Sequence, residues 1–279
     1  MARRLYLITG APGSGKSTLL RLLPEVTDQF QIVPKVTTRR RRKDDGPEIR
    51  SIEHTNSAVI PGTHSLAEFV ASHQLVYKYD YATSTLSVQG PLPHEELKAI
   101  KKAVIDEIDG EKRPDILRAI EALARRANSF PSKYDLIYEQ YNVRYGLASS
   151  DLISLLCRGI SPVAIVNDIR ILRDIKAVFG QQACCIYIYA PLQAHELAAL
   201  QTARGAVNAS GGIDFEQTMR RTEKAKVILR RYIENIEVFD HVIINGRQTP
   251  TELAHQARGI MNAAADSFHE LVVTEDLAE

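Results

Sequence analysis

Residues 5–23 read LYLITGAPGSGKSTLLRLL, and the fold can be argued outward from this stretch. Residues 5–9 are a short apolar run with β-branched members, which predicts a buried strand. Residues 10–17 match the pattern G-x-x-x-x-G-K-[ST], and the apolar residues after them predict a helix. A strand before this pattern and a helix after it are the setting in which it binds phosphate. The stretch therefore predicts a nucleotide-binding α/β domain.

The residue types of this loop follow from its chemistry. Glycines let backbone N–H groups turn inward around phosphate oxygens, and the dipole of the helix that begins near Lys16 adds partial positive charge. Lys16 can reach the β- and γ-phosphates of ATP, and the hydroxyl of Ser17 can ligate the Mg²⁺ that bridges them. The predicted ATP-binding residues are Gly10, Ala11, Pro12, Gly13, Ser14, Gly15, Lys16, Ser17 and Thr18. Pro24 predicts an early end to the helix.

The composition of the 279-residue chain is that of a folded globular protein. Hydrophobic residues make up 44% and charged residues 25%, which excludes disordered, collagen-like and coiled-coil classes. The length suits two domains, or one domain with insertions, at roughly 150 residues per domain. Lys and Arg number 35 and Asp and Glu 34, so the formal net charge is +1. This balance supplies no overall field for nucleic acid or an anionic membrane, and neither is expected as a partner.

The sequence also bears on location and on metals. No apolar run approaches the roughly 18 residues of a membrane span, and the basic start at Arg3 and Arg4 precedes too few apolar residues for a signal peptide. The three cysteines, Cys157, Cys184 and Cys185, lack metal-ligand spacing and suit a reducing compartment as small core residues. We expect a cytoplasmic protein without a structural metal.

A run of cations follows the next predicted strand. Residues 30–37 are apolar and β-rich and predict one strand, at a sheet edge because Pro34 lacks a backbone N–H. Residues 39–43 are five consecutive cations. Such a run is most often a solvated loop or a localisation tract. In a protein that holds a phosphate donor it can instead hold a phosphorylated acceptor, and both interpretations stay open.

Asp168 follows another buried strand, predicted at residues 162–166. Ligands of open α/β sheets bind in the crevice at the carboxyl ends of the strands, so this carboxylate is a candidate neighbour of Mg²⁺ and of the acceptor. The alternative is that Asp168 only caps a helix, because aspartate is a favourable N-cap residue.

The C-terminal part of the chain continues the alternation of strands and helices. Residues 183–189 and 241–246 predict strands, and apolar residues between 215 and 236 recur at helical spacing. Residues 249–264 predict a closing helix with Pro250 near its first turn. The acidic residues 266–279 show little periodicity and are expected to be a disordered tail.

In their order along the chain, these motifs resemble the guanylate kinase family. The resemblance rests on Gly10 to Ser17, Val36-Thr37-Thr38-Arg39 with Arg42, Tyr145-Gly146, Asp168 at a strand end, Arg204-Gly205, Arg221 and Val242-Ile243-Ile244-Asn245. The phosphate loop occurs in many enzyme classes, whereas its combination with T-T-R-x-x-R and Y-G is specific. The resemblance implies an α/β P-loop kinase fold, with a mostly parallel central sheet flanked by helices, an enlarged acceptor-binding subdomain and a lid.

The resemblance also implies a domain plan and an activity. Residues 1–36 and 148–265 would form the kinase core, with a lid at about 200–222, and residues 37–147 the acceptor-binding subdomain. Mg²⁺-bound ATP would donate its γ-phosphoryl group to GMP or dGMP. The residues implied for the acceptor site are Lys35, Arg39, Arg42, Tyr145 and Asp168, and those implied for catalysis are Lys16, Arg204, Arg221 and Asp168. Ser17 would ligate Mg²⁺ directly and Asp168 through water.

Four departures from the family concentrate on the acceptor base. Lys35 stands in place of a serine that touches guanine, and Leu147 in place of a small hydroxyl residue. Leu136 stands in place of the guanine-reading glutamate, which Glu139 or Asp80 could replace. The second phosphate-binding tyrosine is missing.

Because a polar site loses specificity when its base contacts are lost, other acceptors stay open. One alternative is ribose 1,5-bisphosphate, and another is a modified or larger nucleotide. A third alternative is a guanylate-kinase-like module that binds a partner protein.

The chain between the cations and Tyr145 is longer than the resemblance requires. Residues 74–81 alternate as a strand does, and residues 87–132 hold two apolar stripes at helical spacing, which predict an inserted helical hairpin. The hairpin could cover a larger acceptor, bind a protein partner or pack on the core.

Overall fold

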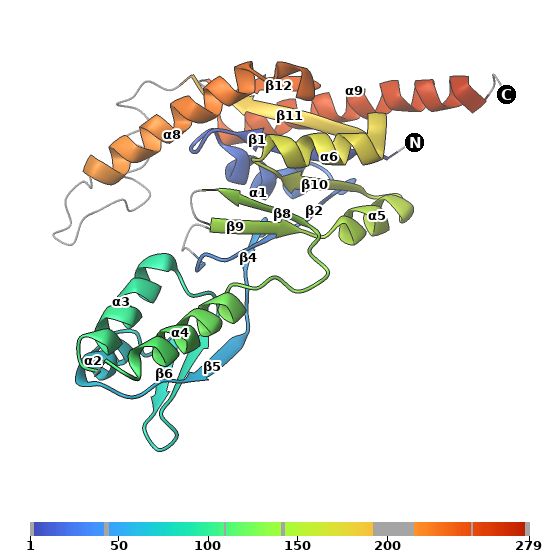
Figure 1. Cartoon of the computed structure of the whole chain (residues 1–279). Helices are drawn as coiled ribbons and strands as arrows, with labels where there is room; N and C mark the ends of the chain where they lie inside the picture. Colours follow the sequence, from blue (N-terminus) through green and yellow to red (C-terminus); the bar gives the residue numbers. More distant parts are fainter. Residues whose placement is uncertain are drawn as a thin grey trace. The chain divides into compact units, whose positions relative to one another are not determined.

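The computed structural model describes residues 3–41, 45–108, 110–140, 143–191, 215–246 and 248–276 (Figure 1). For residues 215–218, 220–222, 224 and 268–276 it describes the backbone alone. The chain divides into two compact units. The first contains Met1–Lys35, Asp44–Glu48 and Ala148–Glu279, and the second contains Val36–Lys43 and Ile49–Leu147.

The first unit is built on a five-stranded parallel sheet with the order β12-β11-β1-β10-β2. Its strands are β1 (Leu5–Gly10), β2 (Phe30–Ile32), β10 (Ser161–Ile165), β11 (Ala183–Tyr189) and β12 (His241–Ile244). Every residue of β1 is buried, because β1 lies between β10 and β11 in the middle of the sheet. The predicted fold class, α/β with a mostly parallel sheet flanked by helices, is confirmed for this unit.

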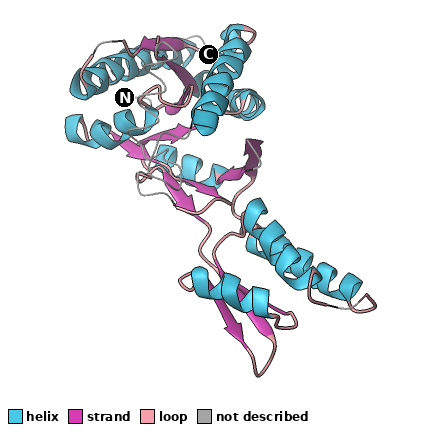
Figure 2. Ribbon diagram, turned by 90° about the vertical axis from the view of Figure 1, so that its left-hand side faces the viewer, coloured by secondary structure: helices cyan, strands magenta, loops and turns pink. Residues whose placement is uncertain are grey.

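Helices cover both faces of this sheet (Figure 2). The helices α1 (Lys16–Val26) and α9 (Pro250–Asp276) share one hydrophobic core with the sheet, in which Leu20 and Met261 are fully buried. On the other face, α8 (Phe215–Ile233) and the start of α6 (Ile169–Phe179) pack on aromatic side chains of β11. The remaining elements are α5 (Ser149–Cys157), which packs on β10, and the short 3-10 turns η1 (Gly180–Gln182) and η2 (Ile236–Val238).

Side chains alternate in direction along β11, so this strand packs against the helices on both faces of the sheet. Cys184, Ile186 and Ile188 belong to the core under α1 and α9, whereas Tyr187 and Tyr189 belong to the cluster under α8. Successive side chains of a strand point to opposite faces, so a strand covered on both sides is apolar throughout. Burial raises the pKa of Cys184, like that of Cys185, to about 12, so these thiols stay protonated as core residues.

The second unit contains two sheets. One has four strands in the order β4-β3-β9-β8, with the pairs β3–β9 and β8–β9 antiparallel. The other has three strands in the order β5-β7-β6, all antiparallel. The strands are β3 (Lys35–Thr37), β4 (Ile49–Ser51), β5 (Thr55–Val59), β6 (Tyr77–Asp80), β7 (Thr85–Gln89), β8 (Leu136–Gln140) and β9 (Val143–Leu147).

Three helices cover one face of the three-stranded sheet and form a hydrophobic core with it. They are α2 (His64–Ser72), α3 (His94–Ile105) and α4 (Arg113–Ala127). The helices α3 and α4 lie within residues 87–132, where the sequence predicts a hairpin, and β6 lies within the predicted strand 74–81. The sequence did not reveal β5, α2 or β7, because these elements are short and rich in Ser and Thr or lack a clear apolar stripe.

Residues 30–37 form two strands in two different sheets, so the prediction of a single strand is wrong. The strand β2 pairs with β10 and β3 pairs with β9. Pro34 lies between them and has no N–H to offer a ladder, while the N–H of Val33 donates to Val163 at 2.8 Å and that of Lys35 to Glu48 at 3.0 Å. Pro34 thus lies between Val33 and Lys35, whose N–H groups bond to different parts of the chain.

Two helices run further than the sequence suggests. Pro24 lies inside α1, which ends at Val26, and the N–H of Thr27 still bonds to the carbonyl of Leu23 at 3.2 Å. The closing helix α9 runs past Ala264 to Asp276, so residues 266–276 are helical where we expected disorder. This continuation needs no apolar stripe, because extending an existing helix adds one hydrogen bond per residue and no Gly or Pro interrupts it there.

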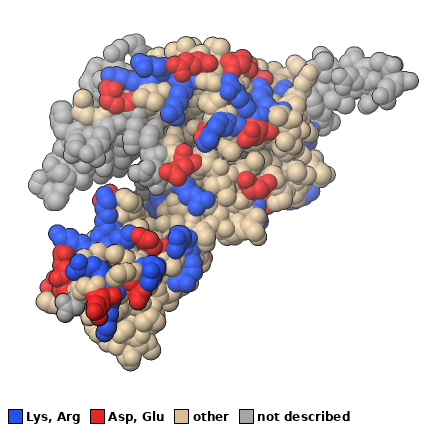
Figure 3. All heavy atoms as spheres, viewed as in Figure 1, with Lys and Arg blue, Asp and Glu red and all other residues tan. Residues whose placement is uncertain are grey.

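The surface agrees with a chain that carries no strong overall charge. On the face seen in Figure 3, basic and acidic side chains of the described residues intermingle. Within the described part of the chain, no helix combines the length and the apolar character that a bilayer crossing needs.

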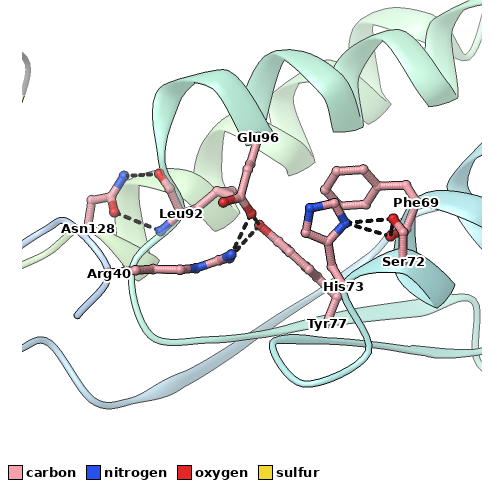
Figure 4. Close-up of polar contacts among 8 residues, drawn as sticks. All are labelled: Arg40, Phe69, Ser72, His73, Tyr77, Leu92, Glu96 and Asn128. Atoms are coloured by element: carbon pink, nitrogen blue, oxygen red, sulfur yellow. Dashed lines mark hydrogen bonds and ion pairs between the residues drawn. The ribbon is translucent and has the colours of Figure 1, made fainter. Parts of the chain in front are cut away.

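Asn128, directly after α4, provides a test of the second unit's own stability. Its side chain accepts from the N–H of Leu92 at 3.0 Å and donates to the carbonyl of Leu92 at 2.9 Å (Figure 4). Asn128→Ala leaves both backbone groups unpaired, so we expect the free energy of unfolding to fall by about 1–3 kcal/mol. Urea unfolding followed by circular dichroism measures this loss.

The control is Arg118→Ala on the same helix, which removes an exposed pair with Asp115. It should change the free energy of unfolding by less than about 0.5 kcal/mol. Equal losses in the two variants would contradict a specific role for the Asn128 amide.

Candidate functional site

The phosphate loop joins the buried end of β1 to the first turn of α1. Gly10 has φ +150° and Gly15 has φ +95°, a region that residues with a side chain rarely adopt. A Cβ at Gly10 would lie 2.5 Å from the carbonyl oxygen of Ile188, and one at Gly15 would lie 2.5 Å from Nδ2 of Asn245. Both glycines are therefore required by their neighbours as well as by the turn.

Lys16 lies over this loop. Its Nζ donates to the carbonyl oxygens of Gly10 at 2.8 Å and Ala11 at 2.7 Å, and to Oγ of Ser14 at 3.3 Å. No described side chain caps α1, so the N–H groups of its first turn point to an end of the helix that is open to an anion. Ser17 is exposed at this end. The arrangement places one ammonium group, a helix N-terminus and a hydroxyl around one loop.

Asn245 supports the loop from the last strand of the sheet. It follows β12, and its Nδ2 donates to the carbonyl oxygen of Ser14 at 3.0 Å. Its own N–H bonds to the carbonyl of Tyr189 at 2.7 Å. The sequence noted Asn245 only as part of a resemblance, and the structure adds a contact that holds the loop against β12.

A buried chain of polar groups lies under the loop, and sequence reasoning missed it. The hydroxyls of Thr9 and Tyr232 are hydrogen-bonded to each other, and Oγ1 of Thr9 donates to Oδ1 of Asn167 at 3.4 Å. Thr9 is fully buried and Tyr232 is 5% exposed. Burial raises the pKa of Tyr232, so its hydroxyl stays protonated and can donate. The pattern at Tyr232 reads as one position of an apolar helical stripe, so the sequence carries no signal for this contact.

Asp168 caps α6. Its Oδ1 accepts from the N–H groups of Arg170 at 3.0 Å and Ile171 at 3.3 Å, and its Oδ2 lies 3.5 Å from the Arg170 guanidinium. The helix-capping alternative therefore describes what this side chain does in the structure. Asn167, its neighbour, bonds to Thr9 at the end of β1, so Asp168 follows a residue tied to the phosphate loop's strand.

The predicted acceptor residues fall in both units. Arg39 is in the second unit, where its N–H bonds to Oγ1 of Thr37 at 3.2 Å and its Nη1 to the carbonyl of Arg40 at 3.0 Å. Tyr145 pairs with Thr37 across β3 and β9 and stacks on Tyr138 at 5.4 Å between ring centroids. In the second unit, Thr37 therefore contacts both predicted residues, Tyr145 across the strand pair and Arg39 two residues further along the chain.

The other predicted site residues belong to the first unit or lie outside the described residues. Lys35 is 4% exposed and belongs to the first unit, as do the phosphate loop and Asp168. Arg42 and Arg204 lie outside the described residues, and of Arg221 only the backbone, in α8, is described.

The residues considered for reading the base are spread over the second unit. Leu147 is fully buried, and Leu136 is half-buried on β8. Glu139 on β8 and Asp80 on β6 are exposed on two different sheets. No contact among the described residues gathers these side chains into one site.

The groups around the loop are of the kinds that bind a triphosphate. Few side chains near the loop could ligate Mg²⁺. Within the described ranges, no three His, Cys, Asp or Glu residues gather as a metal site. Mg²⁺ bound with a nucleotide takes its ligands largely from phosphates and water, with one or two protein oxygens. The exposed hydroxyl of Ser17 is of the required kind, and Oδ2 of Asp168 lies 3.5 Å from the Arg170 guanidinium.

Comparison with known proteins adds little to these observations. No protein-family model matches the chain, and no curated protein matches it. Among solved structures, guanylate kinase from Anaplasma phagocytophilum is similar with a TM-score of 0.45 and 15% sequence identity, over 94% of this chain and 87% of that chain. A similarity at this TM-score carries no argument about function, which rests on the residues described above.

Tyr232→Phe tests whether the buried chain supports nucleotide binding. The change removes the hydroxyl that bonds to Thr9 at the end of β1, so we expect ATP affinity to fall about three- to tenfold. Isothermal titration of the nucleotide into the protein measures the affinity.

Tyr187→Phe is the matched control, because Tyr187 stacks on Tyr232 at 3.7 Å but its hydroxyl has no partner among the described residues. This variant should bind ATP as the unmodified protein does. Loss of affinity in Tyr187→Phe alone would contradict the role given to Tyr232.

Proposed function

We propose that this protein is an ATP-dependent phosphotransferase that moves the γ-phosphoryl group of Mg²⁺-bound ATP to a phosphorylated small-molecule acceptor. The observation that carries the proposal is the loop between β1 and α1, where Lys16 Nζ lies within 2.8 Å of two loop carbonyls beside an uncapped helix N-terminus. A purely protein-binding module has no need for this arrangement. The proposal therefore places catalysis ahead of the scaffold alternative.

On the donor side, the chain's own groups bind and neutralise the triphosphate. The N–H groups of the loop and of the first turn of α1 donate to phosphate oxygens, and Lys16 turns from the loop carbonyls to the β- and γ-phosphates. Ser17 would hold Mg²⁺ directly and Asp168 through water, and the ion would neutralise phosphate charge. Asn245 holds the loop at Ser14, and Tyr232 holds the strand that leads into it at Thr9.

On the acceptor side, we assign the phosphate to Arg39 and Tyr145. A guanidinium and a phenol suit a phosphate dianion, because both donate hydrogen bonds and the first also neutralises charge. Arg42 and Lys35 complete the proposed set, with Lys35 as its most buried member at 4% exposed. Phosphoryl transfer requires positioning and neutralisation more than a covalent helper, so such a set is sufficient in kind.

Arg204 and Arg221 would act on the phosphoryl group as it migrates. Charge develops on the equatorial oxygens of this group during transfer, and one well-placed arginine is worth roughly 10³ to 10⁵ in rate. In this proposal the two arginines come from the lid at about 200–222 and act only when both substrates are bound.

The acceptor proposed first is GMP or dGMP, on the resemblance in the arginine and Tyr-Gly motifs. A second candidate is another phosphorylated acceptor, such as ribose 1,5-bisphosphate or a larger nucleotide. Its support is that Leu147 is fully buried and that Glu139 and Asp80 lie on different sheets, so a guanine-reading set is not gathered. Both candidates keep the same phosphate-binding residues.

An acceptor panel tests the proposed reaction. ADP release from Mg²⁺-ATP is measured with GMP, dGMP, AMP, UMP, CMP and ribose 1,5-bisphosphate as separate acceptors. We expect turnover with GMP and dGMP, and at least about a hundredfold loss in Lys16→Ala because its ammonium neutralises the phosphates.

Circular dichroism should show Lys16→Ala to be folded. Fast turnover with ribose 1,5-bisphosphate alone would move the assignment to the second candidate. Silence with all six acceptors would contradict GMP, dGMP and ribose 1,5-bisphosphate as acceptors, and would point to a larger acceptor or to the binding module.

Arg39→Ala separates the acceptor site from the donor site. The acceptor KM should rise about ten- to hundredfold, because a charge-assisted contact to phosphate is lost, while the affinity for ATP stays unchanged. Arg50→Ala, an exposed arginine of β4 in the same sheet, should change neither constant. An unchanged acceptor KM in Arg39→Ala would show that the acceptor phosphate binds elsewhere.

A further inference from the structure

Arg40, the second residue of the cationic run, is bound by a helix of the predicted insertion and by the neighbouring strand β6. Its Nη2 lies 2.7 Å from Oε2 of Glu96 on α3 and donates to the hydroxyl of Tyr77 on β6 at 2.8 Å (Figure 4). The Tyr77 hydroxyl donates in turn to the same carboxylate. We call Arg40, Glu96 and Tyr77 the arginine clamp. All three residues belong to the second unit.

The surroundings of the clamp favour the hydrogen bonds that its members make. Tyr77 is 1% exposed, so its hydroxyl needs the two partners it has. Burial first, and then the hydrogen bond to Glu96, raise the pKa of Tyr77 and keep it a donor. Glu96 lies in the first turn of α3, where the helix dipole stabilises a carboxylate. The guanidinium of Arg40 also lies over the Tyr77 ring, 5.1 Å from its centroid.

The clamp makes Arg40 unsuited to bind a phosphate, although Arg40 belongs to the cationic run. The charge of Arg40 is already neutralised by Glu96, so Arg40 is a partner of the insertion and a poor ligand for a phosphate. The backbone of Arg40, however, is hydrogen-bonded to the side chain of Arg39. The carbonyl of Arg40 accepts from Nη1 of Arg39 at 3.0 Å, and Oγ of Ser51 donates to the carbonyl of Arg39 at 3.0 Å.

We propose that the insertion sets the affinity for the phosphorylated acceptor by clamping Arg40, with Glu96 as the positioning residue. The clamp fixes the backbone on the C-terminal side of Arg39, and that backbone orients the Arg39 guanidinium. The inference rests on the proposed function in one respect, the role of Arg39 toward the acceptor phosphate. It assigns the inserted helices a role in acceptor binding through positioning, in addition to their own hydrophobic core.

Glu96→Gln tests the clamp in the full-length protein, because it keeps the shape of the side chain and removes its charge. The acceptor KM should rise about threefold to thirtyfold, while kcat and the KM for ATP change little. The matched control is Glu121→Gln, which removes the partner of Lys101 in another pair between α3 and α4, at 2.8 Å. Glu121→Gln should leave all three constants unchanged.

Limited trypsin digestion tests the clamp without any substrate. Peptide fragments are quantified by mass spectrometry after brief digestion, and cleavage after Arg40 is compared with cleavage after the exposed Arg118. In Glu96→Gln the ratio should rise at least about threefold, because the released segment opens more often. In Glu121→Gln the ratio should stay as in the unmodified protein.

The two readouts separate this inference from the proposed function. A raised ratio together with a raised acceptor KM supports the inference. An unchanged ratio overturns it, whatever the kinetics show. A raised ratio with an unchanged acceptor KM, in a protein that turns the acceptor over, overturns the positioning role. If the unmodified protein transfers phosphate to no acceptor, the proposed function fails, and the acceptor role given to the clamp is overturned with it, even where the ratio rises.

Discussion

The burial of β1 between two parallel neighbours is the constraint on which the rest of the first unit depends. All six residues of β1 are buried, and the strand ends at Gly10, which has no room for a Cβ against Ile188 of β11. The chain therefore leaves the sheet at Gly10 and passes through a short loop into α1. Within this turn the N–H of Ser14 bonds to the carbonyl of Ala11 at 3.1 Å, and no described side chain caps the first turn of α1, where an anion can accept from the helix N–H groups.

Polar residues bond to the loop and to the strand that leads into it. Asn245, which follows β12, donates to the loop carbonyl of Ser14, whereas Tyr232 of α8 and Asn167, which follows β10, bond to the hydroxyl of Thr9 in β1. These contacts are buried or half-buried, so each is expensive to lose. A loop held in this way needs little reorganisation when an anion binds, which is the condition under which fixed dipoles are most effective.

In the second unit, like charges lie next to one another in the cationic run, although the chain as a whole is balanced in charge. The three-stranded sheet and its helices form a separate core, and α3 presents a carboxylate to the cationic run through Glu96. Neutralising Arg40 inside the unit divides a run of like charges into members with different roles. An opposite charge on a packed helix is an effective way to do this, because the helix fixes its position before any ligand arrives.

The sequence by itself determined the strand, glycine-rich loop and helix at residues 5–23, the parallel α/β class and the helices α3 and α4, because spacing and periodicity are local properties of a chain. It did not separate β2 from β3 or reveal β5 and β7, since the ladder that a short strand joins depends on partners far along the chain. Tertiary structure alone decided the contacts of Tyr232 and Glu96. A tyrosine in an apolar stripe or a glutamate in a first helical turn carries no mark of its partner, and only packing brings Thr9 and Arg40 to them.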